Sequence, residues 1–167
     1  MTPVEFLQEI VRPNVVEFRS DQSDMRRAYN AVAAVDGFVA HIYVWCLTNA
    51  PAEVAGLLED SAYRNKLAER HADFGLLRDI SKAQKHVKLN RGAPIISEAN
   101  QIVSRPVGYG EGPYGHGGYG GPQQVVIDID TTTMRYVGQI VDSALEFLEG
   151  ELARLMSSES AEGEAGV

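Results

Sequence analysis

A long apolar stripe with helical spacing runs near the end of the chain and most constrains its fold. Seven apolar residues recur there three or four positions apart: Met134, Val137, Val141, Leu145, Leu148, Leu152 and Leu155. Residues at this spacing share one face of an α-helix, and an apolar face must be buried against other elements. The stripe therefore predicts a helix packed in a bundle.

The start of the chain carries its own helix signals. The opening "TPVE" is a capping box, with Thr2 as N-cap, Pro3 at the first helical position and Glu5 three residues after the cap. We expect this helix to reach about Arg19, with a kink or restart at Pro13 because proline lacks a backbone N–H.

Three more helices are expected before residue 90. The second begins after Ser23 or Asp24 and carries a stripe at positions i, i+4 and i+7. The members of that stripe are Met25, Tyr29, Val32, Asp36, Val39 and Tyr43. A third helical region opens at Pro51 and turns Leu58 inward. Asp73 is a suitable N-cap for a fourth helix.

The helical period stops after Asn90. Residues 102–107 and the alternating segment "QQVVIDID" at 123–130 have strand character, and a Gly/Tyr-rich segment, 108–121, separates them. We therefore expect a β-hairpin over about residues 95–130. The following "TTTMRYV" could first extend this hairpin, so the start of the last helix stays open.

These segments predict a single, mainly α domain over residues 1–156. It is a bundle of four or five helices with an inserted β-hairpin that carries a Gly/Tyr-rich loop. The apolar content of 44% and the charged content of 23% are typical of a globular protein. Residues 157–167 have no apolar period and are expected to form a disordered tail.

Composition disfavours several classes of protein. Cys46 is the single cysteine, so no disulfide framework and no cysteine metal site are expected. His41 and His116 have no neighbours at metal-ligand spacing, so we expect neither a metal nor a cofactor. The chain has no membrane-length apolar run and no signal-like start. We therefore expect a cytoplasmic protein that does not bind membranes.

The charge of the chain is unevenly distributed. The net charge of −8 disfavours general binding to nucleic acid, yet residues 64–91 alone carry +5 and the remainder −13. The cations of this basic strip are Arg64, Lys66, Arg70, Arg78, Lys82, Lys85, Lys88 and Arg91. The strip is a candidate surface for RNA.

The Gly/Tyr-rich segment allows three interpretations. A phosphate-binding loop requires glycines between a strand and a helix, whereas this segment leads into another strand. Tyr109, Tyr114 and Tyr119 recur every five residues, which would permit stacking on the bases of a single strand. The simplest interpretation is a flexible hairpin tip.

Arg64 and His71 are the candidate catalytic pair. They are seven residues apart in "RNKLAERH", so on a continuous helix both side chains would leave the same face. His71 could then move the proton of a ribose hydroxyl, and Arg64 could hold the phosphate. The alternative is that both residues lie on a solvated helix face.

The motif resembles the R-x(4–6)-H signature of the HEPN superfamily, including the polar residue Asn65 directly after Arg64. HEPN proteins are small helical bundles, and many are metal-independent ribonucleases or inactive relatives of them, commonly dimeric. The resemblance implies a helical, homodimeric protein that cleaves or binds RNA.

A second resemblance covers residues 25–155. The segment "DFGLLRDISKAQKHVKLNR", followed by a Gly/Tyr-rich hairpin and a terminal helix, is similar to uncharacterised bacterial proteins with an "FRLLRDIxNxxKHxxLxR" core. Carried over by position, it marks Arg78, Asp79, Lys85 and His86 as binding residues. Asp79 and His86 are seven apart and are expected to share a face, while His86 could also cap the end of its helix.

Asp36 interrupts an otherwise apolar stripe. A buried carboxylate needs a partner, and Arg78, His71 and His86 are candidates; the alternative is a position in water at the edge of the stripe.

The sequence is therefore compatible with two functions. One is a HEPN-like metal-independent ribonuclease or RNA-binding protein. The other is a non-catalytic, homodimeric interaction protein in which the same residues are structural.

Overall fold

The computed structural model describes residues 1–89, 94–107, 121–130 and 133–164. Its helices are α1 (Pro3–Phe6), α2 (Arg12–Ser20), α3 (Met25–Asn49), α4 (Asp60–Arg70), α5 (Ala72–His86) and α6 (Val137–Glu164). Its strands are β1 (Ile102–Pro106), β2 (Gln123–Asp128) and β3 (Met134–Tyr136). The predicted mainly α fold with an inserted hairpin is confirmed.

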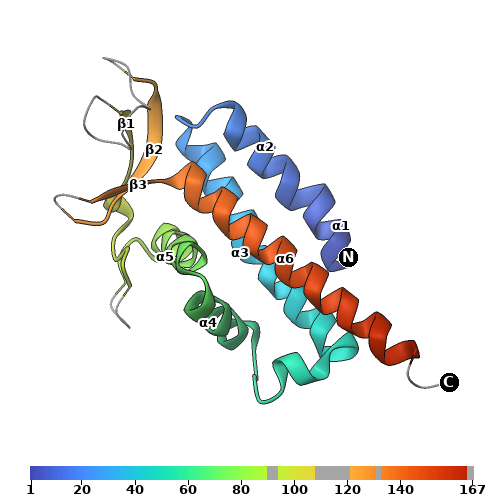
Figure 1. Ribbon diagram of the computed structural model, residues 1–167. Helices are drawn as coiled ribbons and strands as arrows, with labels where there is room; N and C mark the ends of the chain where they lie inside the picture. Colours follow the sequence, from blue (N-terminus) through green and yellow to red (C-terminus); the bar gives the residue numbers. More distant parts are fainter. Residues whose placement is uncertain (90–93, 108–120, 131–132, 165–167) are drawn as a thin grey trace.

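Helix α6 lies along α3, with α2 on one side and α5 on the other, and the sheet caps one end of the bundle (Figure 1). The large apolar side chains of the helices meet in one core. Phe18, Phe38, Tyr63, Phe74 and Leu148 are all fully buried there, one from each of α2 to α6.

The predicted capping box at the N-terminus is confirmed, because Thr2 and Glu5 bond each other's backbone N–H groups. Between α1 and α2 the chain makes a π-turn at Leu7–Val11, in which the Arg12 N–H reaches back to the Leu7 carbonyl. Helix α2 thus restarts directly before Pro13. A proline is tolerated in this first turn, where an N–H has no helical partner.

The helix that the sequence predicts from Pro51 onward starts later in the structure. Pro51 opens only a 3-10 turn, Pro51–Val54, and α4 begins at Asp60. Gly56 lies between them with φ +78°, a conformation that ends the helical path. Leu58, which was expected to face inward, is 97% exposed.

The hairpin is part of a three-stranded antiparallel sheet in the order β1-β2-β3. Strand β1 pairs with β2 from Ile102↔Ile127 to Pro106↔Gln123, and β3 pairs with β2 through Val126↔Tyr136. Met134–Tyr136 therefore extend the hairpin as β3, and the last helix begins at Val137, so Met134 of the predicted helical stripe lies in the strand. Tyr109, Tyr114 and Tyr119 lie outside the described residues.

Helix α6 continues to Glu164, so the prediction of a disordered tail over residues 157–167 is wrong for residues 157–164, whose backbone is helical. Among the described helices, α3 is long and apolar enough to cross a membrane. However, 56% of its most apolar window is buried inside the bundle, as in the core helix of a soluble protein.

Candidate functional site

Residues from both candidate motifs meet where α3, α4 and α5 pack together. Asp36 of α3 lies at the centre, with Arg64 of α4 on one side and Ser81 and Lys85 of α5 on the other. Arg78 of α5 lies beside this group. We call these five residues the Asp36 cluster.

Asp36 is buried, with 7% of its surface exposed. Its Oδ2 accepts a hydrogen bond from Ser81 Oγ at 3.0 Å and lies 3.7 Å from Lys85 Nζ. Its Oδ1 lies 3.4 Å from Arg64 Nε. The expectation that a buried Asp36 has a partner is met, but by Ser81, Arg64 and Lys85. None of the predicted partners, Arg78, His71 and His86, forms an ion pair or hydrogen bond with its carboxylate among the described residues.

Arg64 is held by two further acceptors. Its Nη1 bonds the carboxylate of Asp60, one helical turn earlier on α4, and its Nε donates to the Asp36 backbone carbonyl at 3.3 Å. The guanidinium thus lies between two carboxylates. This arrangement suits a structural arginine that joins α3 to α4.

Arg78 is the most unusual member of the cluster. It is 8% exposed, and its Nη1 donates to Asn65 Oδ1 at 2.6 Å. Its buried Nε has no hydrogen-bond partner, and no carboxylate of the described residues lies within ion-pair distance of it. Burial lowers the pKa of Arg78, and the nearby Arg64 lowers it further, against the effect of Asp36.

A row of cations continues from Arg78 along α5. Lys82 and Lys85 follow at i+4 and i+7, so all three share one side of the helix. The side chains of Lys82 and Lys85 are 45% and 59% exposed, and each lies at ion-pair distance from one carboxylate, Asp79 at 4.0 Å and Asp36 at 3.7 Å. Burial of part of Lys82, together with the charge of Arg78, lowers the pKa of Lys82. The row therefore places three cations along one side of α5, against the two carboxylates that its lysines contact.

The side chains of Asp79 and His86 do not contact each other in the described part of the chain. Asp79 accepts a hydrogen bond from the Ile95 N–H at 2.8 Å, which fastens the segment after α5. His86 is exposed on the last turn of α5. Their spacing on one helix is as expected, but no contact joins these two described side chains.

The same-face prediction for Arg64 and His71 is wrong. Helix α4 ends at Arg70, and His71 has an extended backbone, φ −144° and ψ 109°. His71 is instead the N-cap of α5, the role expected of Asp73: its Nδ1 accepts from the Phe74 N–H at 3.2 Å. Its ring stacks on Phe147 of α6 with centroids 4.5 Å apart.

Much of the remaining basic strip is paired internally. Arg70 bonds Glu151 at 2.5 Å, Lys88 bonds Glu98 at 2.7 Å, and Lys66 Nζ donates to the Glu53 carbonyl. Arg91 lies outside the described residues. The strip as a whole is therefore less available to RNA than its sequence implies.

Two residues at this site were not predicted from the sequence: Ser81, a member of the cluster, and Asp60, which pairs with Arg64. Asp60 precedes Arg64 by four residues on one helix, a spacing that by itself favours an ion pair. Ser81 gave no such signal, because only its burial against Asp36 distinguishes it from a surface serine. Among the described residues no group of three metal-ligating side chains gathers, here or elsewhere.

No family model, curated protein or solved structure matches this chain. The resemblances to the HEPN superfamily and to the bacterial proteins with the "RDI…KH" core remain predictions.

Proposed function

We propose that the protein binds single-stranded RNA through the cationic row Arg78, Lys82 and Lys85 and does not cleave it with Arg64 and His71. The observation that carries this proposal is the environment of Arg78. Its guanidinium is largely removed from water and has Asn65 as its hydrogen-bond partner among the described residues, without a carboxylate at ion-pair distance.

A buried charge is unfavourable unless an opposite charge lies close to it. A phosphate can supply that charge, and guanidinium groups bind phosphate oxygens with two parallel hydrogen bonds. Lys82 lies 4.0 Å from Asp79 and Lys85 lies 3.7 Å from Asp36, but both lysine side chains are exposed enough that neighbouring phosphates of the same strand could also bind them.

Catalysis by Arg64 and His71 is disfavoured by what each side chain already contacts. Asp36 and Asp60 neutralise Arg64. His71 uses Nδ1 to cap α5 and one face of its ring to stack on Phe147. A general base needs its nitrogen within hydrogen-bond reach of the reacting proton. RNA binding by α5 would leave these contacts of Arg64 and His71 in place.

The test is fluorescence anisotropy with a labelled single-stranded RNA. With three phosphate contacts, we expect the logarithm of the binding constant to fall with the logarithm of the salt concentration with a slope of about −2. The double variant Lys82→Gln/Lys85→Gln should weaken binding about tenfold or more and make this slope shallower. Lys66→Gln is the matched control, since Lys66 belongs to the basic strip but donates to Glu53.

Equal affinity of the wild type and the double variant would contradict binding at this row, as would an equal loss in Lys66→Gln. Cleavage is tested separately by incubating the RNA with the protein and a chelator. Cleavage by the wild type that disappears in both Arg64→Ala and His71→Ala would contradict the non-catalytic part of the proposal.

A further inference from the structure

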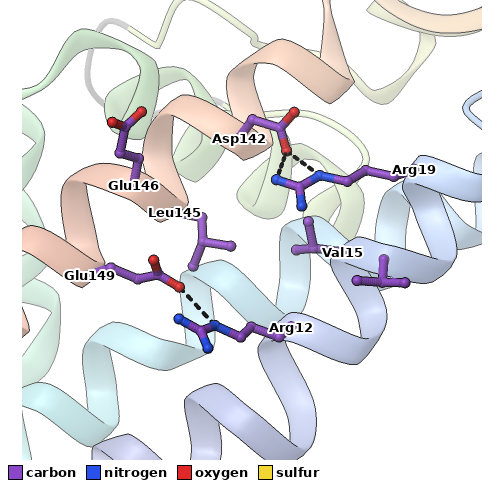
Figure 2. Close-up of a pocket in the computed structure, with 8 residues that line it drawn as sticks. Arg12, Val15, Arg19, Asp142, Leu145, Glu146 and Glu149 are labelled. Atoms are coloured by element: carbon purple, nitrogen blue, oxygen red, sulfur yellow. Dashed lines mark hydrogen bonds and ion pairs between the residues drawn. The ribbon is translucent and has the colours of Figure 1, made fainter.

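Arg78 differs from the other described arginines in having no described carboxylate close to it. Each of the others has a carboxylate oxygen within 4.0 Å of its guanidinium. In the groove between α2 and α6, for example, Arg12 bonds Glu149 at 3.0 Å and Arg19 bonds Asp142 at 2.6 Å (Figure 2). Arg78 is also more deeply buried than these two exposed arginines. It therefore lacks the close counter-charge that the others have.

The guanidinium of Arg78 approaches the surface beside Asn65. Asn65 is exposed on α4, and its Oδ1 accepts the hydrogen bond from Arg78 Nη1 because a guanidinium has only donors to offer. The Nδ2 of the same amide donates to no described residue. Arg78 Nε is buried and has no acceptor in the described part of the chain. The contact between α4 and α5 thus leaves two N–H donors free for an anion.

The burial of Arg78 decides which kind of phosphate suits it. Because Nε is buried, its acceptor has to enter the protein surface and cannot lie across it. An internal phosphate of an RNA strand carries a nucleoside on each side. A terminal phosphate monoester is joined to the strand by one bond, presents three oxygens and carries up to two negative charges at neutral pH. The monoester is therefore the better fit, and the exposed Asn65 side chain can turn outward to admit it.

We propose that Arg78 and Asn65 form a site for the terminal phosphate monoester of a single-stranded RNA, which rests on the proposed binding of RNA by α5. The guanidinium of Arg78 binds the terminal phosphate, and Asn65 Nδ2 donates to one of its oxygens. Lys82 and Lys85 follow about 6 and about 10 Å farther along α5, at 1.5 Å per residue, where they bind the next phosphates. The end of the strand thus fixes its position on the cationic row.

The test compares three forms of one internally labelled single-stranded RNA by fluorescence anisotropy at a fixed salt concentration. One form has a 5′-phosphate, one has a 3′-phosphate, and one has hydroxyl groups at both ends. We expect the 5′-phosphate or the 3′-phosphate form to bind at least about tenfold more tightly than the hydroxyl form, because hydrogen bonds between charged groups are stronger than neutral ones. The form with the advantage identifies which end of the strand the site binds.

Asn65→Asp is the variant that targets this site. It places a carboxylate of nearly the same shape beside Arg78 Nη1, where it supplies the missing counter-charge and repels phosphate. The advantage of the phosphorylated RNA should therefore be lost. Because position 65 is exposed and the new charge pairs with Arg78, the variant should keep the helical circular dichroism of the wild type.

The matched control is Asn49→Asp. Asn49 is exposed at the end of α3, about 20 Å from Asp36 along that helix at 1.5 Å per residue. The control makes the same change in net charge, and it should keep the advantage of the phosphorylated RNA.

The outcomes separate this proposal from the proposed function. If all three RNAs bind equally and binding still depends on Lys82 and Lys85, the proposed function stands and the terminal-phosphate site is overturned. The site is also overturned if Asn65→Asp keeps the advantage, or if Asn49→Asp loses it to the same extent. If none of the three RNAs binds, both proposals fail.

Discussion

At the scale of single residues, Asp36 shows how a polar side chain can belong to a core. Its stripe packs α3 into the bundle, so the carboxylate is carried into the interior with the apolar residues beside it. Ser81, Arg64 and Lys85 then surround it from the two neighbouring helices. The buried carboxylate of Asp36 is tolerated because packing of the helices places these hydrogen-bond and ion-pair partners around it.

Replacing Asp36 should therefore destabilise the fold. We expect Asp36→Ala and Asp36→Leu to lower the free energy of unfolding by about 2–4 kcal/mol, because buried Ser81 loses its acceptor and Arg64 and Lys85 lose a neutralising charge. Urea unfolding followed by circular dichroism measures this change.

The control for Asp36 is Glu17→Ala, which removes the exposed acid of two surface ion pairs with Arg26 and Arg27. Its effect should stay within about 1 kcal/mol. Equal stability of Asp36→Ala and the wild type would mean that the ion pairs of the cluster contribute nothing.

At the scale of elements, the joint between α4 and α5 has the largest effect on the candidate site. A single residue, His71, separates the two helices and serves as C-cap of the first and N-cap of the second. Asp73, the residue predicted to cap α5, instead bonds Arg135 of β3 at 2.9 Å. The joint directs Arg64 toward Asp36 and His71 toward Phe147.

The cap role of His71 is testable. His71→Ala should lower the free energy of unfolding by about 1 kcal/mol for the lost cap, with a further contribution from the lost stacking on Phe147. His71→Asn should recover the cap part of the loss, because asparagine is a favourable N-cap.

Thermal unfolding of the two His71 variants and the wild type gives the comparison. If His71 were catalytic and had no structural role, both variants would be as stable as the wild type.

At the scale of the whole molecule, Glu151 joins separate parts of the bundle. It lies on α6 with 6% of its surface exposed and bonds Arg70 of α4 at 2.7 and 2.5 Å. Arg154 bonds Glu151 and also Glu53 in the turn after α3. Burial opposes the ionisation of Glu151, but these two arginines outweigh it together and lower its pKa below the ordinary value of 4.5.

This shift predicts how stability depends on pH. A carboxylate with a lowered pKa in the folded state stabilises the fold above about pH 4.5, and that contribution is lost as the pH falls through the folded pKa. Urea unfolding of Glu151→Gln should therefore show lower stability than the wild type at pH 7, with the difference shrinking toward pH 3. The control Glu69→Gln changes an exposed residue, and its stability should not differ from that of the wild type in this pH-dependent way. If Glu151→Gln were less stable than the wild type by the same amount at every pH, the stabilising role given to ionised Glu151 would be contradicted.

Much of the secondary structure follows from local patterns. Three local patterns predicted their elements correctly: the capping box at Thr2, the alternation of residues 123–130 and the apolar stripe of the last helix. Each pattern depends on residues that are only a few positions apart in the sequence. Errors occurred where a local signal competed with packing: Leu58 was expected inside, and Asp73 was expected to cap. The helix break at His71 had the same cause, since "RNKLAERH" is a continuous helical pattern by itself.

The mainly α bundle with an inserted hairpin is predictable from local patterns, because helix period, strand alternation and caps depend on neighbouring residues. Which charged residues meet depends on the tertiary packing. Arg64, Asp36 and Ser81 come from three helices, and their distances depend on how those helices pack and where α4 ends. The sequence carried the cations of the basic strip. Packing separated those that hold the bundle together from Arg78, whose guanidinium is buried without a carboxylate partner in the described part of the chain.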